Sequence, residues 1–200
     1  MPTGVHIRDA RRQLFDAAER ILLRDGPSEL TSRAVTAEAG VAKGVLHRHF
    51  ADFDAFLAEL VQDRITRIEG QAAALRESAG TGSVAGNLTG ALIDLFESVA
   101  VGIISLVIFR DELRARLRAA GPAHGVPIMT EAAAMIASYL TDECELGRIA
   151  ADSDVGSLAL SLIGAGHLLF AGREGARPDA AAVEKVVTTV IADVTQRRLL

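Results

Sequence analysis

The sequence predicts an all-α fold, and three observations support this prediction. Apolar residues recur every three or four positions along most of the chain, which is the period of amphipathic helices. Alanine, leucine and valine dominate, aromatic residues make up only 4% of the chain, and Trp is absent. No alternation of apolar and polar residues extends beyond four positions, so no strand is expected.

The first helix is expected to begin at Asp9 and to end at the Gly26–Pro27 pair, because glycine terminates helices and proline cannot continue them. Thr31 is a good N-cap for a short second helix that ends near Ala39. The apolar stripe of the first helix consists of Leu14, Ala17, Ala18 and Ile21.

Gly40 supplies a turn before a third short helix, and Asp52 is a good N-cap for a long fourth one. The four glycines between Gly80 and Gly90 predict a loop. The expected helices from the third onward cover residues 43–50, 53–77, 88–118 with a break near 110, 128–146, 154–170 and 179–197.

The second and third helices form a predicted helix-turn-helix. They share an apolar seam, which consists of Val35, Ala39, Val41, Leu46 and Phe50. The other side of the third helix presents cations, a small glycine and an apolar side chain. These are the groups with which a recognition helix contacts phosphates, guanine and thymine methyl groups in a major groove. His47 and His49 lie on different helix faces, which argues against a shared metal ion.

The N-terminal sequence resembles the TetR (tetracycline-repressor-like) family of regulators. The resemblance rests on a motif that lies between the first and the fourth helix, T-x-x-x-V-x-x-x-A-G-V-x-K-G-x-L-x-x-H-F. The resemblance is specific over about residues 11–60 and architectural beyond them. It implies that Arg33 and His49 contact the DNA backbone, and that Lys43, Val45 and Arg48 face base edges or phosphates. The predicted DNA-binding residues are Thr31, Arg33, Ala42, Lys43, Gly44, Val45, His47, Arg48 and His49.

Three positions depart from the family pattern. The family usually has Tyr at the position of His47, Lys at that of Phe53, and Ser or Thr at that of Ala42. Each change removes a hydrogen-bonding or charged group from the expected DNA surface, so weaker or differently specified binding is expected. If Phe53 replaces a phosphate-binding Lys, one phosphate contact is lost. The slope of the logarithm of the binding constant against the logarithm of the salt concentration then becomes shallower by about one unit.

The family resemblance also implies a two-domain organisation, with a DNA-binding domain at residues 1–52 and a helical ligand-binding and dimerisation domain at residues 53–200. The last two helices are expected to pair with their copies in a homodimer; the alternative is that their stripes only close the core of the monomer. The dimer candidates are Leu158, Leu162, Ala165, Leu169, Val183, Val187, Val190 and Val194.

The expected control input is a small, neutral or hydrophobic effector, because the central helices are apolar on more than one face and carry few charges. The candidate lining residues are Phe96, Ile103, Met135, Tyr139 and His167, for each of which ordinary core packing is the alternative. These expectations combine into a ligand-responsive repressor that binds near-palindromic operator DNA as a dimer.

The charge distribution agrees with an anionic partner at the N-terminus: residues 1–50 carry eight Arg/Lys and six Asp/Glu, while the whole chain has a net charge of −5. A single cysteine, Cys144, excludes an internal disulfide and a multi-cysteine metal site, and no cofactor is expected. The apolar run 98–109 is shorter than the roughly twenty residues that span a bilayer, so a cytoplasmic protein without a membrane partner is expected.

Two other classes of function stay open. One is a helical protein-interaction module that does not bind DNA. The other is a cofactor-dependent helical enzyme, which is disfavoured because the sequence contains no H-E-x-x-H, no G-x-x-x-x-G-K-[ST] and no G-x-S-x-G.

Overall fold

The computed structural model describes residues 3–97, 100–120, 125–171 and 178–197, and within these ranges it contains ten α-helices, one 3-10 turn and no strand. The predicted all-α fold is confirmed. The chain divides into two compact units: residues 1–63 with 102–126, and residues 64–101 with 127–200. These bounds differ from the expected division after residue 52, which stays a prediction about function.

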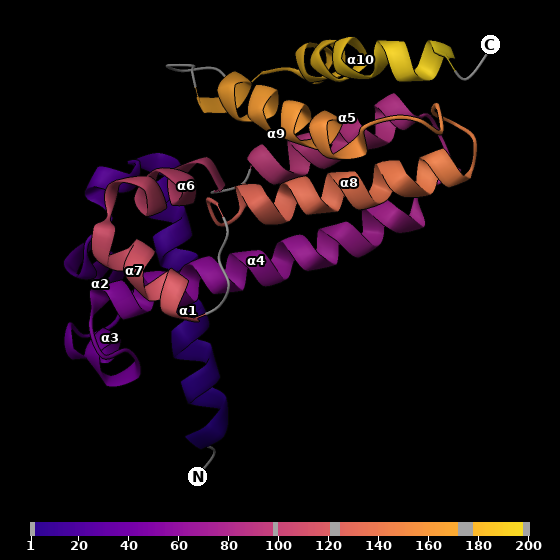
Figure 1. The fold of residues 1–200 in the computed structure, drawn as a ribbon. Coiled ribbons are helices and arrows are strands. Elements are labelled where there is room, and N and C mark those ends of the chain that lie inside the picture. Colours follow the sequence, from indigo (N-terminus) through magenta and orange to yellow (C-terminus); the bar gives the residue numbers. More distant parts are fainter. Residues whose placement is uncertain (1–2, 98–99, 121–124, 172–177, 198–200) are drawn as a thin grey trace. The chain divides into compact units, whose positions relative to one another are not determined.

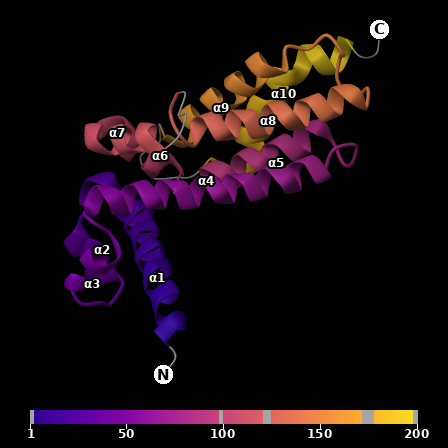
Figure 2. The ribbon, with the colours of Figure 1, turned by 60° about the horizontal axis from the view of Figure 1, so that its bottom comes forward.

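The first unit contains the three N-terminal helices, the beginning of α4 and most of the α6–α7 segment. Its elements are α1 (Thr3–Arg24), η1 (Pro27–Glu29), α2 (Ser32–Glu38), α3 (Gly44–His49), α4 (Phe53–Glu77) up to residue 63, α6 (Ala100–Phe109) from residue 102, and α7 (Asp111–Ala120). Helices α2 and α3 pack against each other and against α1 (Figure 2).

The core of the first unit is formed by the apolar stripe of α1 and by an aromatic cluster. All four residues of the predicted stripe are buried. The ring centres of Phe15, Phe50 and Phe56 are 5.1–5.9 Å apart. Aromatic pairs at such separations add stability beyond that of buried area alone.

The second unit consists of the remainder of α4 and four further helices. These are α5 (Val84–Phe96), α8 (Met129–Glu145), α9 (Val155–Ala171) and α10 (Ala180–Arg197). Helix α9 packs against α8 and α10, and α10 also packs against α5 (Figure 1). At Gly166 of α9, an added Cβ would lie 2.7 Å from the ring of Phe96, so the packing of α5 on α9 requires a glycine there.

Most of the expected helix starts are correct because their N-caps are formed. Five capping side chains accept a hydrogen bond from the N–H three residues further on, namely those of Thr31, Asp52, Ser83, Asp154 and Asp179. The cap at Ser83 corrects the predicted loop between Gly80 and Gly90, because α5 begins at Val84. The expected break near Arg110 is confirmed, and α5 ends at Phe96, earlier than the sequence indicated.

None of the helices in the described ranges is by itself long and apolar enough to cross a membrane. Helices α5 and α6 reach that length and composition only together, as a bent pair.

Candidate nucleic-acid interface

Helices α2 and α3 form a helix-turn-helix around the turn at Gly40. Gly40 has a φ of +67°, in the left-handed region that favours glycine. The N–H of Val41 donates to the carbonyl of Thr36 at 3.0 Å, which closes the end of α2. Val35, Leu46 and Phe50 are buried, whereas Ala39 and Val41, the other members of the predicted seam, are half-buried.

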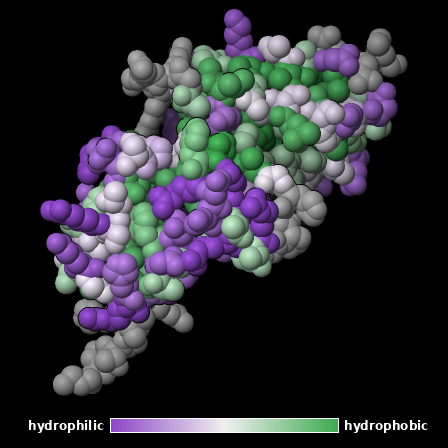
Figure 3. All heavy atoms as spheres, turned by 60° about the vertical axis from the view of Figure 1, so that its left-hand side comes forward, coloured by the Kyte–Doolittle hydropathy of each residue, from purple (hydrophilic) through white to green (hydrophobic). Residues whose placement is uncertain are grey.

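All nine predicted DNA-binding residues lie at the surface. Val45 and His49 are half-buried, and the other seven are exposed. On α3 the helical period explains this distribution, because Gly44, His47 and Arg48 point away from the buried Leu46. Lys43 is the exposed N-cap that precedes the helix. Residues 31–50 contain three Arg/Lys and one acidic residue, a formal charge of +2. Polar and charged side chains cover much of the N-terminal helices (Figure 3).

The single acidic residue of this segment, Glu38, is neutralised by two arginines of α1. Its Oε1 accepts from Arg20 Nε at 2.8 Å, and its Oε2 lies 3.1 Å from Arg24 Nη1. These two arginines lower the pKa of Glu38 below its usual range. The ion pairs hold α2 on α1 and leave Arg33, Lys43 and Arg48 as the cations that α2 and α3 present.

Arg11 holds the C-terminal end of α3, a role that sequence reasoning did not detect. Its guanidinium lies 4.5 Å from the centre of the Phe50 ring, and its Nη1 donates to the carbonyl of His49 at 3.4 Å. Arg11 also forms an ion pair with Glu59 of α4. A cation at the carboxyl end of a helix is favourable, but the sequence alone does not show that α1 and α3 meet here.

Phe53, the residue at which the sequence departs from the usual Lys of the family it resembles, is half-buried. Its ring stacks on that of Phe56, with 5.6 Å between the ring centres, and lies beneath the guanidinium of Arg110. Phe53 therefore has a packing role in the first unit. Its effect on the salt dependence of DNA binding stays a prediction.

The five candidate effector-lining residues are mostly core residues, and their role in binding an effector stays a prediction. Phe96, Ile103, Met135 and Tyr139 are buried, and His167 is half-buried. Of the five, Met135 lines a described cleft. Burial lowers the pKa of His167, whose Nδ1 has no hydrogen-bond partner among the described residues.

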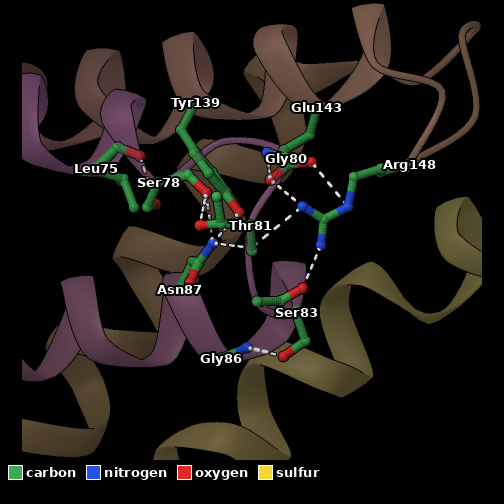
Figure 4. A network of polar contacts seen from close by, with 11 residues as sticks. Leu75, Ser78, Gly80, Thr81, Ser83, Gly86, Asn87, Tyr139, Glu143 and Arg148 are labelled. Carbon is green, nitrogen blue, oxygen red and sulfur yellow. Dashed lines mark hydrogen bonds and ion pairs between the residues drawn. The ribbon is translucent and has the colours of Figure 1, made fainter.

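Tyr139 belongs to a buried polar network (Figure 4). Its hydroxyl accepts a hydrogen bond from Asn87 Nδ2 at 3.0 Å. Burial is the main reason why the pKa of Tyr139 is raised, and a hydrogen bond with Glu143 raises it further. The fully buried Glu143 lies 3.4 Å from Arg148 Nε, and Arg148 donates to the carbonyls of Thr81 and Gly82 at 3.2 and 2.7 Å. Core packing and hydrogen bonds to the protein therefore account for Tyr139.

Four of the eight dimer candidates are buried in the single chain. Leu162, Val183, Val187 and Val194 are buried in the core of their own unit, so their side chains are not available to a second copy. The half-buried candidates are Leu158, Ala165, Leu169 and Val190. Helix α9 instead exposes Leu160 and Leu168, with exposed fractions of 67% and 73%.

The single cysteine, Cys144, is half-buried, and its thiol donates to the carbonyl of Ala150 at 3.6 Å. Burial raises the pKa of Cys144.

Comparisons with known proteins agree with the helix-turn-helix. Residues 14–60 match the model of the family described as bacterial regulatory proteins, tetR family. The chain is 32% identical over 69 residues to the HTH-type transcriptional regulator PksA of Bacillus subtilis (strain 168). This match covers 33% of the chain and spans only 34% of the length of PksA.

Two solved structures extend the likeness in fold to nearly the whole chain. A putative TetR-family transcriptional regulator from Mesorhizobium loti MAFF303099 has a TM-score of 0.66 at 18% identity, covering 96% of this chain and 97% of that one. A gamma-butyrolactone receptor, described as ArpA-like, has a TM-score of 0.53 at 22% identity, covering 97% and 100%. Residues 14–60 therefore resemble the tetR family of bacterial regulatory proteins, and the chain shares its all-helical fold with solved structures described as TetR-family regulators.

Proposed function

We propose that the chain is a transcriptional repressor that binds a near-palindromic operator as a homodimer and responds to a small-molecule effector. The observation that carries this proposal is the exposed surface of α3 and its N-cap, where Lys43, His47 and Arg48 face solvent while Leu46 is buried. A major groove about 12 Å wide admits such a helix, and side chains on its outer face reach base edges and phosphates.

The length of α3 supports the homodimer. Six residues extend over about 9 Å of helix axis, so α3 contacts only a few base pairs. Two copies on inverted half-sites read a longer sequence, as dimeric helix-turn-helix proteins do. A bound dimer blocks transcription by occupying the operator, so no separate activation surface is needed.

The proposed dimer surface is the exposed side of α9. Leu160, Gly164 and Leu168 are spaced four residues apart, so they lie along one side of the helix. An added Cβ at Gly164 would meet nothing within 4 Å, which leaves room for the close approach of another helix. The half-buried Leu158, Ala165, Leu169 and Val190 are candidates for the margin of this surface.

An effector is part of the proposal because the second unit is a helical domain like that of the gamma-butyrolactone receptor, whose description names a small ligand. PksA and the Mesorhizobium loti protein are described as transcriptional regulators, and we propose no enzymatic activity for this chain. A protein-interaction module without DNA binding stays the alternative.

Fluorescence anisotropy with duplex DNA from the region beside the protein's own gene tests the proposal. We expect saturable binding in the presence of competitor DNA, with two protomers per site. The variant Lys43→Ala/Arg48→Ala should lose this binding, whereas Arg118→Ala/Lys185→Ala, with the same change in charge at exposed positions of α7 and α10, should retain it. Equal binding by both double variants would contradict a role for α3.

A further inference from the structure

A cleft of about 330 Å³ lies between α4, α5 and α8 in the second unit. Its floor is formed by the buried side chains of Leu75 and Met135. Small residues of α4, of the turn that follows it and of α5 line the cleft, namely Ala74, Ser78, Gly86, Gly90 and Ala91. Pockets for small organic ligands have volumes of about 300–1,000 Å³ and largely apolar linings, so this cleft suits a small molecule.

One end of the cleft is preformed by the buried polar network (Figure 4). Asn87 and Ser78 line this end. Asn87 Nδ2 donates to the hydroxyl of Tyr139 and to the carbonyl of Ser78, at 3.0 and 3.2 Å, and the hydroxyl of Ser78 donates to the carbonyl of Leu75 at 2.6 Å. These hydrogen bonds already hold the side chains in place. A ligand that enters the cleft therefore binds without the free-energy cost of ordering them.

The other end of the cleft is acidic. Asp94 is the charged residue among the described lining residues, and Gln71 of α4 also lines the cleft. Asp94 lies seven residues after Asn87 on α5, so the two ends are about 10 Å apart along the helix. A carboxylate beside an apolar floor attracts an organic cation and repels an organic anion.

We propose that this cleft binds a small organic cation, whose apolar body lies over Leu75 and Met135 and whose ammonium group faces Asp94. This replaces the neutral or hydrophobic effector expected from the sequence with an amphiphilic amine, which is charged at one end. The inference deepens the proposed regulatory function, but its test uses no DNA, so a failure of one is distinguishable from a failure of the other.

Isothermal titration calorimetry of the full chain with three ligands of equal chain length tests the proposal. The ligands are n-octylamine, 1-octanol and octanoate. We expect octylamine to bind most tightly and octanoate most weakly, because the apolar chain is constant and only the charge changes. Equal affinities for octylamine and octanoate, or no binding of octylamine, would overturn the proposal.

Two glycines provide a matched pair of variants that locate the binding site. Gly90 lines the cleft and Gly70 lies on α4; both are exposed, and an added Cβ at either would meet nothing within 4 Å. Gly90→Leu fills the cleft and should weaken octylamine binding at least tenfold, whereas Gly70→Leu should leave it unchanged. Equal effects of the two substitutions would place the ligand elsewhere and overturn the proposal.

Asp94→Asn tests the charge without filling the cleft. It should weaken octylamine binding roughly threefold, as expected for an exposed ion pair, and leave octanol binding unchanged. If Asp94→Asn retains the full preference for octylamine over octanol, the carboxylate does not select the cation and the proposal is wrong.

Discussion

The guanidinium of Arg110 lies over the ring of Phe53, 5.7 Å from the ring centre. The same guanidinium forms an ion pair with Asp54, with 2.8 Å between Nη2 and Oδ1. Arg116 of α7 forms a second ion pair, with Asp52. A hydrogen bond from the N–H of Ala55 lowers the pKa of Asp52 below its usual range, and the positive charge of Arg116 has a smaller effect in the same direction. Arg110 and α7 are thereby joined to the first turn of α4, directly after the helix-turn-helix.

Arg110→Met should lower the free energy of unfolding by about 1 kcal/mol, because it removes a partly exposed cation–π contact and a partly exposed ion pair. Urea denaturation measures this change. Arg118→Met, at an exposed position of the neighbouring helix, is the control and should change stability by less than about 0.5 kcal/mol. Equal effects of the two substitutions would show that the contacts with Phe53 and Asp54 contribute nothing.

Arg148→Met should destabilise the protein much more than Arg76→Met. Arg148 is paired with Glu143, which is fully buried, whereas Arg76 pairs with the partly exposed Asp142 at 2.9 Å. Removing the partner of a buried charge costs about 3–5 kcal/mol, and removing that of a surface charge less than about 1 kcal/mol. Urea denaturation of both variants distinguishes the two cases. A difference below about 1 kcal/mol would mean that Glu143 does not depend on Arg148.

Leu160→Glu/Leu168→Glu should convert the proposed homodimer into a monomer, because four charges would then face each other across the two copies of α9. Light scattering after size-exclusion chromatography gives the mass. The control is Leu23→Glu/Leu146→Glu, which adds the same charge at two other exposed leucines. A dimer that persists in Leu160→Glu/Leu168→Glu would move the interface away from this side of α9.

The half-buried His167 makes stability depend on pH. Burial lowers its folded-state pKa below the ordinary value of 6.5. As the pH falls through about 6.5, the unfolded chain therefore takes up a proton before the folded one does, and stability decreases. His167→Gln should reduce the loss of stability between pH 7 and about pH 5, as measured by thermal unfolding. The control His47→Gln changes an exposed imidazole; the same reduction there would argue against a special role of His167.

The helix-turn-helix could be predicted almost completely from the sequence. Two short amphipathic helices around Gly40 have only one way to bury Val35, Leu46 and Phe50, so the opposite side must be exposed. The arginines that hold these helices in place could not be predicted. The ion pair between Arg110 and Asp54 joins residues 56 positions apart, and no local pattern reveals such a contact.

The second unit was harder to predict because α9 is apolar on more than one side. Leu160, Leu162 and Leu168 all suit a buried or a dimeric position, and periodicity does not distinguish the two. The stripe of α9 that was predicted to form the dimer interface contained Leu162, which is buried. Similarly, Tyr139 was the kind of residue that lines an effector site, but its hydroxyl is satisfied by Asn87.

The cleft escaped sequence analysis because its glycines indicated a loop. Glycine costs about 1 kcal/mol relative to alanine within a helix, yet Gly86 and Gly90 lie in α5. The cap at Ser83 and the buried side chains of Leu88 and Leu92 favour this helix. Tertiary packing outweighs local propensity here, and the absent side chains leave the cleft open toward α4.

Selection of binding sites from a random duplex library by the purified protein tests the central claim most directly. The account predicts enrichment of inverted half-sites whose centres are about 10 base pairs apart, one turn of DNA or a multiple of it. It also predicts that Lys43→Ala/Arg48→Ala abolishes this enrichment. A library that is not enriched by the native protein, or that is enriched equally by this variant, would contradict the claim that α3 reads operator DNA.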